Sequence, residues 1–313
     1  MTLTAQAPDA GVPTLVNASS NVGIRGQLKE IWTYRELLGG LVRKELKVKY
    51  KNSVLGFLWT LLNPALYLVV FWLAFDVLLD SRVPQFFVFF LSGYLIWTLF
   101  SNSIALGTGS VLANSALVKK LYFPREVLPL AQVGAAIVHF FLQSVVLLAT
   151  LVIVWHDVSF RFMILLPPAL LIAVALATGI TLVTSSLNVR LRDTEHFVEL
   201  GLLAWFWLTP IVYPFGTVYS DRISPMFRWG FERNPITAVI ITFQRAIHNV
   251  TYFCESTGKV DITNCPDVKQ VLPNEPMIWY AVQLAIAGVI SLLVLYGGLR
   301  YFRRTSGDFA EEI

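Results

Sequence analysis

The sequence predicts an all-α integral membrane protein with six transmembrane helices. Hydrophobic residues make up 56% of its 313 residues and charged residues 14%, whereas about a quarter of a soluble domain is charged. Five stretches reach the roughly 20 apolar residues that cross a bilayer. A sixth contains Pro210 and Pro214, which we expect to kink or break it near its end. The predicted spans cover residues 54–79, 86–106, 127–155, 162–187, 197–218 and 277–299.

The sequence before the first span divides into two parts. Residues 1–26 lack the apolar core of a secretory signal and are rich in Ala, Pro, Asn and Ser, which predicts a disordered cytoplasmic tail. Residues 27–52 have the amphipathic pattern of a helix that lies in the membrane interface. Its apolar arc holds Ile31, Leu38, Val42 and Leu46, and its basic arc holds Arg43, Lys44, Lys47 and Lys51.

This basic arc has two interpretations. A cation beside anionic headgroups gains about 1 kcal/mol, so the arc suits the headgroup of a lipid-linked anion. The same charge also anchors the first span by the positive-inside rule, and that role alone explains most of it.

The distribution of charge predicts the topology. Most of the 24 Lys and Arg residues fall in segments that lie inside when both termini are cytoplasmic, as the positive-inside rule requires. We therefore expect a multi-pass protein of the inner (plasma) membrane, with a cytoplasmic tail at residues 301–313 and a long outer loop at residues 219–276. Because topology accounts for the basic residues, the net charge of +4 does not indicate a nucleic-acid partner.

Two loops stand out in this topology. Residues 107–124 are too short and too polar to span, and they predict a cytoplasmic helix that is either a docking surface or an ordinary connector. In the outer loop, residues 236–247 form an apolar stretch of suitable length for a re-entrant or interfacial helix, with Asn234 as its cap and Pro235 in its first turn. Cys254 and Cys265 follow; outside the cell they form a disulfide or remain two thiols, and they do not complete a metal site.

The sequence contains no motif of an enzyme. A phosphate-binding loop of the G-x-x-x-x-G-K-[ST] type is absent, so the chain does not bind ATP by that route, and no zinc, redox or hydrolase motif occurs. His139 is the ionisable residue deepest in a span, and we expect it to face the bundle and form a hydrogen bond there. The aromatic side chains near the span ends are either interfacial belts or apolar platforms for sugar rings; the candidates are Trp59, Trp205, Trp207 and Tyr213.

Five segments are considered together: RELLGGLVRKELKVKYKNSVLGFLWTLLNP, KKLYFPREVLPLA, LNVRLRDTEHFVELGLLAWFWLTPIVYP, RNPITAVIITFQRAI and YFRRTSGDFAEEI. In this order they resemble the membrane subunit of ABC-type exporters of lipid-linked polysaccharides, such as O-antigen, teichoic acid and actinobacterial galactan. The resemblance implies a homodimer, two copies of a separate cytoplasmic ATPase that binds ATP and Mg, and a galactan as the preferred substrate. It implies a lateral gate beside the first and fifth spans and an outer mouth closed by the helices around residues 234–247.

The resemblance also assigns residues. It implies that residues 112–124 form a coupling helix that docks on the ATPase, and the candidate docking residues are Asn114, Ser115, Leu117, Lys119, Lys120, Phe123, Pro124 and Arg125. The cysteine pair lies in a loop insertion to which the family assigns no role. Two other functions remain open: a flippase driven by an ion gradient, against which the scarcity of intramembrane acids argues, and a membrane-bound glycosyltransferase or assembly scaffold.

Overall fold

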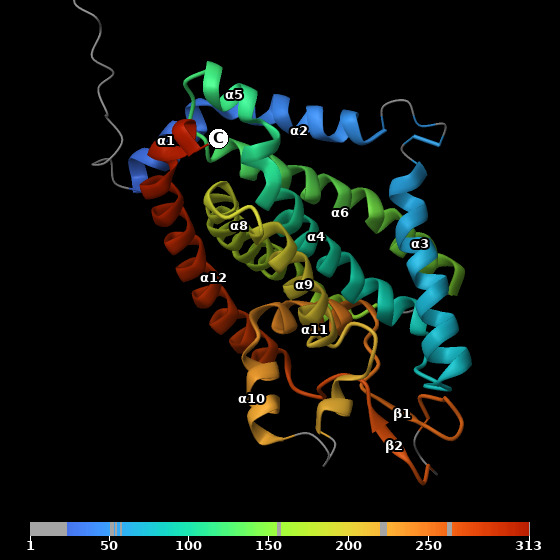
Figure 1. Ribbon diagram of the computed structural model, residues 1–313. Helices are drawn as coiled ribbons and strands as arrows, with labels where there is room; N and C mark the ends of the chain where they lie inside the picture. Colours follow the sequence, from blue (N-terminus) through green and yellow to red (C-terminus); the bar gives the residue numbers. More distant parts are fainter. Residues whose placement is uncertain are drawn as a thin grey trace, which may run out of the picture.

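The computed structural model describes residues 24–50, 53, 55–56, 58–154, 158–219, 224–261 and 265–312. These residues are mainly helical, and Figure 1 shows that the long helices pack into a single bundle. The elements are α1 (Ile24–Thr33), α2 (Arg35–Tyr50), α3 (Leu58–Trp72), the π-helix η1 (Leu73–Leu78), α4 (Phe86–Ala113), α5 (Ser115–Lys120), α6 (Val127–Val154), α7 (Phe160–Met163), α8 (Leu166–Arg190), α9 (Thr194–Trp207), η2 (Phe215–Tyr219), α10 (Pro225–Arg233), α11 (Pro235–Ile247), β1 (Tyr252–Cys254), β2 (Val268–Gln270), α12 (Met277–Thr305), η3 (Ser306–Asp308) and α13 (Phe309–Glu312).

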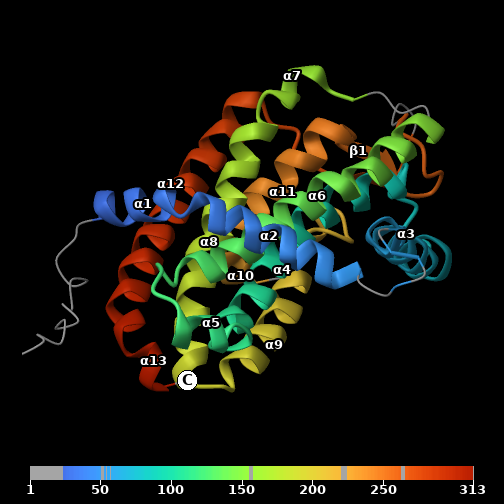
Figure 2. The same cartoon turned by 90° about the horizontal axis from the view of Figure 1, so that it is seen from above.

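Five helical segments of the described chain are long and apolar enough to cross a membrane: α3 with η1, α4, α6, α8, and α12 with η3. The all-α membrane fold is therefore confirmed. Helix α4 lies at the centre, and 78% of its most apolar window is buried, against 6% for α3 and η1. Helix α3 accordingly stands at the edge of the bundle (Figure 2).

The sixth predicted span, residues 197–218, is not a single helix. Helix α9 begins at Thr194 and ends after 14 residues at Trp207, a length of about 21 Å at 1.5 Å per residue. The break comes three residues before Pro210, as expected from a residue that lacks a backbone donor. Other boundaries also differ from prediction. Helix α4 continues seven residues beyond 106 to Ala113, α8 runs from Leu166 to Arg190 and not from 162 to 187, and α12 continues beyond 299 to Thr305. The amphipathic segment is two helices separated at Tyr34.

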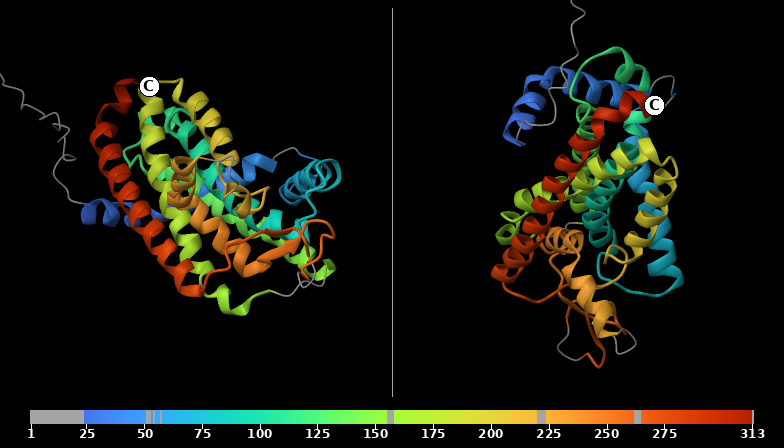
Figure 3. Two further views of the ribbon diagram at one scale, coloured as in Figure 1. Left: turned by 90° about the horizontal axis from the view of Figure 1, so that it is seen from below. Right: turned by 60° about the vertical axis from the view of Figure 1, so that its left-hand side comes forward.

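The two ends of the bundle differ in structure. Helices α1, α2, α5 and α13 lie at one end, which we call the helical end, and α10, β1 and β2 lie at the other, the strand end (Figures 1 and 3). Strands β1 and β2 pair antiparallel. The predicted cytoplasmic segments gather at the helical end and the predicted outer loop at the strand end, so the structure separates them as a single orientation requires.

Small residues allow a close contact between α8 and α12. A Cβ atom on Gly179 of α8 would lie 2.6 Å from the backbone nitrogen of Leu295 in α12, closer than a side chain tolerates. Glycine at this position therefore lets the two helix backbones touch, as small residues do in membrane bundles.

Candidate functional sites

At the helical end, a predicted headgroup cation binds a predicted docking residue. Lys44 Nζ donates a hydrogen bond to Asn114 Oδ1 at 2.7 Å, and Asn114 Nδ2 donates to Ser110 O at 2.8 Å. Asn114 is only 8% exposed and lies between α4 and α5. Lys44 therefore connects α2 to the turn that begins the coupling segment.

The other predicted headgroup cations have different surroundings. Arg43 and Lys47 are exposed on α2, where they are accessible to an anion. Lys51 lies outside the described residues. On the described chain, the candidate headgroup site therefore consists of Arg43 and Lys47. The ammonium group of Lys44 is less available to a headgroup because it donates a hydrogen bond to Asn114.

The apolar face of α2 packs on protein. A Cβ atom added to Gly134 of α6 would lie only 2.8 Å from Val42 Cγ2, so Val42 packs directly on this glycine. Leu41 is buried, with 7% of its surface exposed. Helix α1 differs, since Trp32 and Leu28 are exposed. We conclude that α2 is anchored on α6, while α1 presents apolar side chains to its surroundings.

The segment from Asn114 to Arg125 has an exposed tip and a buried base. Lys119 and Lys120 are exposed at the end of α5, and the next two residues, Leu121 and Tyr122, are also exposed, Tyr122 at 84%. The remaining docking candidates are less accessible: Ser115 and Leu117 are half-buried, and Phe123 and Pro124 are buried. The sequence prediction did not name Leu121 and Tyr122, whose exposed apolar side chains are typical of a contact surface.

Both ends of the chain hold the base of this segment. Arg125 Nη1 donates to the Ser306 carbonyl, and its guanidinium lies 5.9 Å from the Phe309 ring centre. Burial lowers the pKa of Arg125, and the negative charge of Glu126 opposes this shift. The next residue, Glu126, is buried and accepts a hydrogen bond at 2.8 Å from Gln27 Nε2 of α1.

The predicted tail at residues 301–313 is therefore a packed element in its described part. Phe302 and Phe309 are fully buried, with ring centres 5.3 Å apart. Arg190, at the end of α8, forms ion pairs with Asp308 at 2.9 Å and Glu312 at 3.2 Å. Apolar burial and these ion pairs fix α13 beside α5 and α8, which a composition-based prediction of a tail did not foresee.

A cleft at the strand end collects three of the predicted gate residues. Its volume is about 810 Å³, and α9, α10 and the start of α11 line it, among them Trp205, Asn234 and Pro235. Asn234 Oδ1 accepts a hydrogen bond from the backbone of Ile236 and caps α11, with Pro235 at the first position. The cleft wall is mainly apolar, which suits the ring face of a sugar or a lipid chain.

The remaining gate residues lie apart from this cleft. Tyr213 Oη donates to the Trp207 carbonyl at 2.9 Å, so these two residues stabilise the break after α9. Trp59 is exposed at the start of α3. The predicted set therefore divides into a cleft group, a break group and an isolated residue.

An aromatic strip joins α3, α4 and α9, and sequence reasoning missed most of it. Successive ring centres lie 5.0–5.8 Å apart from Tyr67 through Tyr94, Phe90, Phe71, Phe206 and Trp97 to Phe100 and Trp205. Aromatic residues at such spacing contribute packing energy, and Phe90, Tyr94, Trp97 and Phe100 of the strip are buried in the bundle. Their assembly requires contacts between three helices, which no local pattern reveals.

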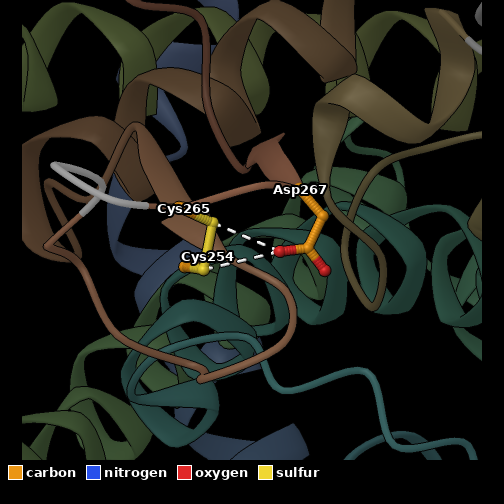
Figure 4. Close-up of side chains that lie close together, drawn as sticks. All are labelled: Cys254, Cys265 and Asp267. Carbon is orange, nitrogen blue, oxygen red and sulfur yellow. Dashed lines mark hydrogen bonds between the residues drawn. A yellow bond between two sulfur atoms is a disulfide. The ribbon is translucent and has the colours of Figure 1, made fainter.

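His139 and the cysteine pair complete the predicted residues. His139 is 8% exposed in α6 and faces the bundle. Cys254 and Cys265 form a disulfide, with Asp267 Oδ1 at 3.5 and 3.2 Å from their sulfur atoms (Figure 4). Because the disulfide leaves no thiolate, these three residues do not fit a metal site.

Comparison with known proteins gives consistent matches. The sequence model of the ABC-2 type transporter family matches residues 36–247. An O-antigen export system permease protein RfbA of Myxococcus xanthus is 30% identical over 286 residues, 91% of this chain and 98% of that protein. A Klebsiella pneumoniae protein of the same name is 32% identical over 68% of this chain and 81% of its own. The capsule polysaccharide export inner-membrane protein CtrC of Neisseria meningitidis is 27% identical over 61% of this chain and 71% of its own.

Proposed function

Because the chain belongs to the ABC-2 type transporter family of membrane proteins, we propose that it is the transmembrane subunit of an ATP-driven exporter. Its cargo is a lipid-linked polysaccharide, moved from the cytoplasm to the outer face of the inner membrane. The observation that carries the proposal is the alignment with an O-antigen export permease along 91% of this chain. A galactan is the substrate we prefer within this class, on the resemblance to actinobacterial members.

The energy comes from a separate partner in this proposal. Two copies of a cytoplasmic ATPase bind ATP and Mg and dock on the helical end of two copies of this chain. The exposed tip at Lys119, Lys120, Leu121 and Tyr122 supports docking, because an exposed tyrosine is typical of a protein interface and two lysines beside it would attract an acidic partner surface. The buried base would pass a movement of this tip to α1, α2 and α12.

The substrate path runs from α2 to the strand end. The anionic headgroup meets Arg43 and Lys47, and the glycan passes the apolar cleft between α9 and α11, where Trp205 lines the wall. Such surfaces bind sugar rings through many weak contacts, and weak contacts let a polymer move on. Opening between α3 and α9, which meet through Phe71 and Phe206, forms the lateral gate.

Reconstitution tests the proposed function. The chain is purified with its ATPase and placed in vesicles with a lipid-linked polysaccharide, and we expect the glycan to reach the far side only when ATP is supplied. Transport by this chain alone without ATP would instead support the ion-gradient flippase, and a complex without transport would support the scaffold.

A charge reversal tests the docking surface. Lys119→Glu with Lys120→Glu is expected to release the ATPase on purification while leaving the folded membrane subunit intact. The matched control, Arg192→Glu with Arg300→Glu, makes the same charge change at two other exposed residues near the helical end and should retain the complex. Equal retention by both variants would contradict the docking assignment.

A further inference from the structure

The turn between η1 and α4 has an unusual backbone. Asp80, Arg82 and Gln85 have positive φ angles of 50°, 50° and 51°, a region that residues other than glycine rarely adopt. Such conformations persist where surrounding contacts enforce them. The contacts of this turn therefore indicate what holds it.

Arg82 joins this turn to the disulfide-closed hairpin. Its Nε and Nη2 donate to the two carboxylate oxygens of Asp80, each at 2.7 Å, and its Nη1 donates to the Ser256 carbonyl at 2.6 Å. A planar guanidinium suits this geometry, because two of its N–H groups form a bidentate pair with the carboxylate while a third N–H donates to the hairpin. The pair also raises the pKa of Arg82 and lowers the pKa of Asp80.

The hairpin is a firm partner for Arg82. The disulfide between Cys254 and Cys265 closes it, the β1–β2 pairing extends from this closure, and Ser256 Oγ donates to Asp267 Oδ1 at 2.9 Å. Phe253 and Cys254 are buried. Ser256 is thus presented from a cross-linked and anchored segment.

A second contact fixes the same turn to α11. His248, directly after α11, donates from Nε2 to the Pro84 carbonyl at 2.7 Å. Val83, between Arg82 and Pro84, is 3% exposed. The turn therefore has one link to the hairpin and another to α11, on two sides of a buried residue.

The first span contrasts with this anchored turn. Only 6% of the most apolar window of α3 and η1 is buried, so its packing against the described chain is sparse. Its last part, η1, is a π-helix, a form often found at functional sites in helices. Within it Asp76 accepts a hydrogen bond from Trp72 Nε1 at 3.0 Å. The first span is consequently followed, at the strand end, by a turn that is bonded to the hairpin and to His248, whereas along its length few of its side chains are buried.

We propose that Arg82 is a positioning residue for export, which with the disulfide-closed hairpin fixes the strand end of the first span as the pivot of its movement. This inference rests on the proposed function, because a lateral gate beside the first span requires that span to move. The proposal gives a role to the loop insertion that holds the cysteine pair, because its hairpin supplies the Ser256 carbonyl to which Arg82 donates.

Hydrogen exchange tests the contact itself. In Arg82→Ala, the rate of amide exchange in residues 73–85 and 252–258 is expected to rise about fivefold. This is the effect of losing a charge-assisted hydrogen bond that solvent screening has weakened. ATP-driven export should also fall. The control is Lys259→Ala in the same hairpin, where the backbone bond from Cys254 N to Lys259 O survives. Unchanged exchange in Arg82→Ala, or an equal rise in residues 110–125, would overturn the proposal.

A covalent replacement tests whether position is what Arg82 supplies. A Cβ atom on Gly258 would lie 3.5 Å from Arg82 Cβ, within the range for a disulfide. Arg82→Cys combined with Gly258→Cys should form a second bridge, verified by peptide mapping, and recover the export and slow exchange that Arg82→Cys alone loses. Gly258→Cys alone measures the strain of a side chain at φ +67°.

Every outcome of the bridge experiment decides the question. A bridged protein with slow exchange that still exports poorly shows that position is not what Arg82 contributes. If Gly258→Cys alone leaves exchange in the hairpin unchanged, failure of the double variant to form the bridge shows that the turn and hairpin are not held together. Wild-type protein that lacks ATP-driven export refutes the proposed function, whereas the exchange result then still reports on the contact.

Discussion

The contact between Lys44 and Asn114 allows a quantitative prediction. Hydrogen bonds to charged groups contribute about 1.5–3 kcal/mol, but the Lys44 side chain is 47% exposed, and solvent screening reduces the pair to about 1 kcal/mol. We therefore expect Lys44→Met and Asn114→Leu to be non-additive by about 1 kcal/mol. The assay is a double-mutant cycle of unfolding free energies in detergent, with the wild type, both single variants and the double variant.

Arg43 provides the matched control for this cycle. It is a neighbouring exposed cation on α2, so Arg43→Met and Asn114→Leu should add within about 0.5 kcal/mol. A coupling energy for Lys44 and Asn114 no larger than this control value would refute the contact.

The same variants separate a connecting role from a headgroup role. With the ATPase present and lipid-linked glycan as the stimulant, Arg43→Met should raise the half-saturating glycan concentration and retain the maximal ATPase rate. Lys44→Met should lower the maximal rate, because it loosens α2 from the α4–α5 turn. A shift in half-saturation alone for Lys44→Met would return this residue to the headgroup site.

Four further predictions concern stability. Phe309→Ala should cost about 3 kcal/mol or more in unfolding free energy, because it empties a fully buried site, whereas the exposed Phe160→Ala should cost little. Gly179→Ala should cost about 1–3 kcal/mol by overpacking against the α12 backbone, with Gly201→Ala, which meets no atom within 4 Å, as the control in the same denaturation assay. Cys254→Ser with Cys265→Ser should favour opening of the hairpin by about 3 kcal/mol, detected as faster proteolysis within it than in Thr257→Ala. Arg82 lowers the pKa of Asp80 from its ordinary value, so the stabilisation is present at neutral pH and is lost as the pH falls through that lowered pKa. The protection factors of residues 80–85, which are corrected for the pH dependence of intrinsic exchange, should therefore be constant from about pH 8 to 5 and fall only at stronger acidity. A fall near pH 6 would contradict the assignment.

Composition and the periodicity of apolar residues were sufficient to predict the main architecture. Five spans follow from apolar length, a property that each segment carries by itself. The cap at Asn234 and the first-turn Pro235 are equally local and appear in the structure. The break after α9 was also foreseen from its two prolines, although its position at Trp207 depends on how the chain turns toward α11.

Contacts between distant segments were beyond this reasoning. The sequence shows a basic arc on residues 27–52. It does not show that Lys44 donates a hydrogen bond to Asn114, which lies 70 residues further along the chain. It shows a polar C-terminal segment but not that Phe309 is buried beneath Arg125. In each case the local pattern reports the polarity of a residue, whereas its partner depends on tertiary packing.

These long-range contacts suit the coupling role that we propose for the segment from Asn114 to Arg125. A short helix such as α5, with six residues, is too short to be stable alone, so force applied to its tip would unravel it unless its ends were held. Lys44 holds the start through Asn114, and Arg125 and Glu126 hold the end through residues from opposite ends of the chain. In the proposed mechanism, a push on the exposed tip is passed through these contacts to α2, α1 and α12. Helix α2 leads to the first span, which Arg82 links at its far end to the hairpin. A span driven at one end and fixed at the other moves by tilting, which is the movement that a gate beside it requires.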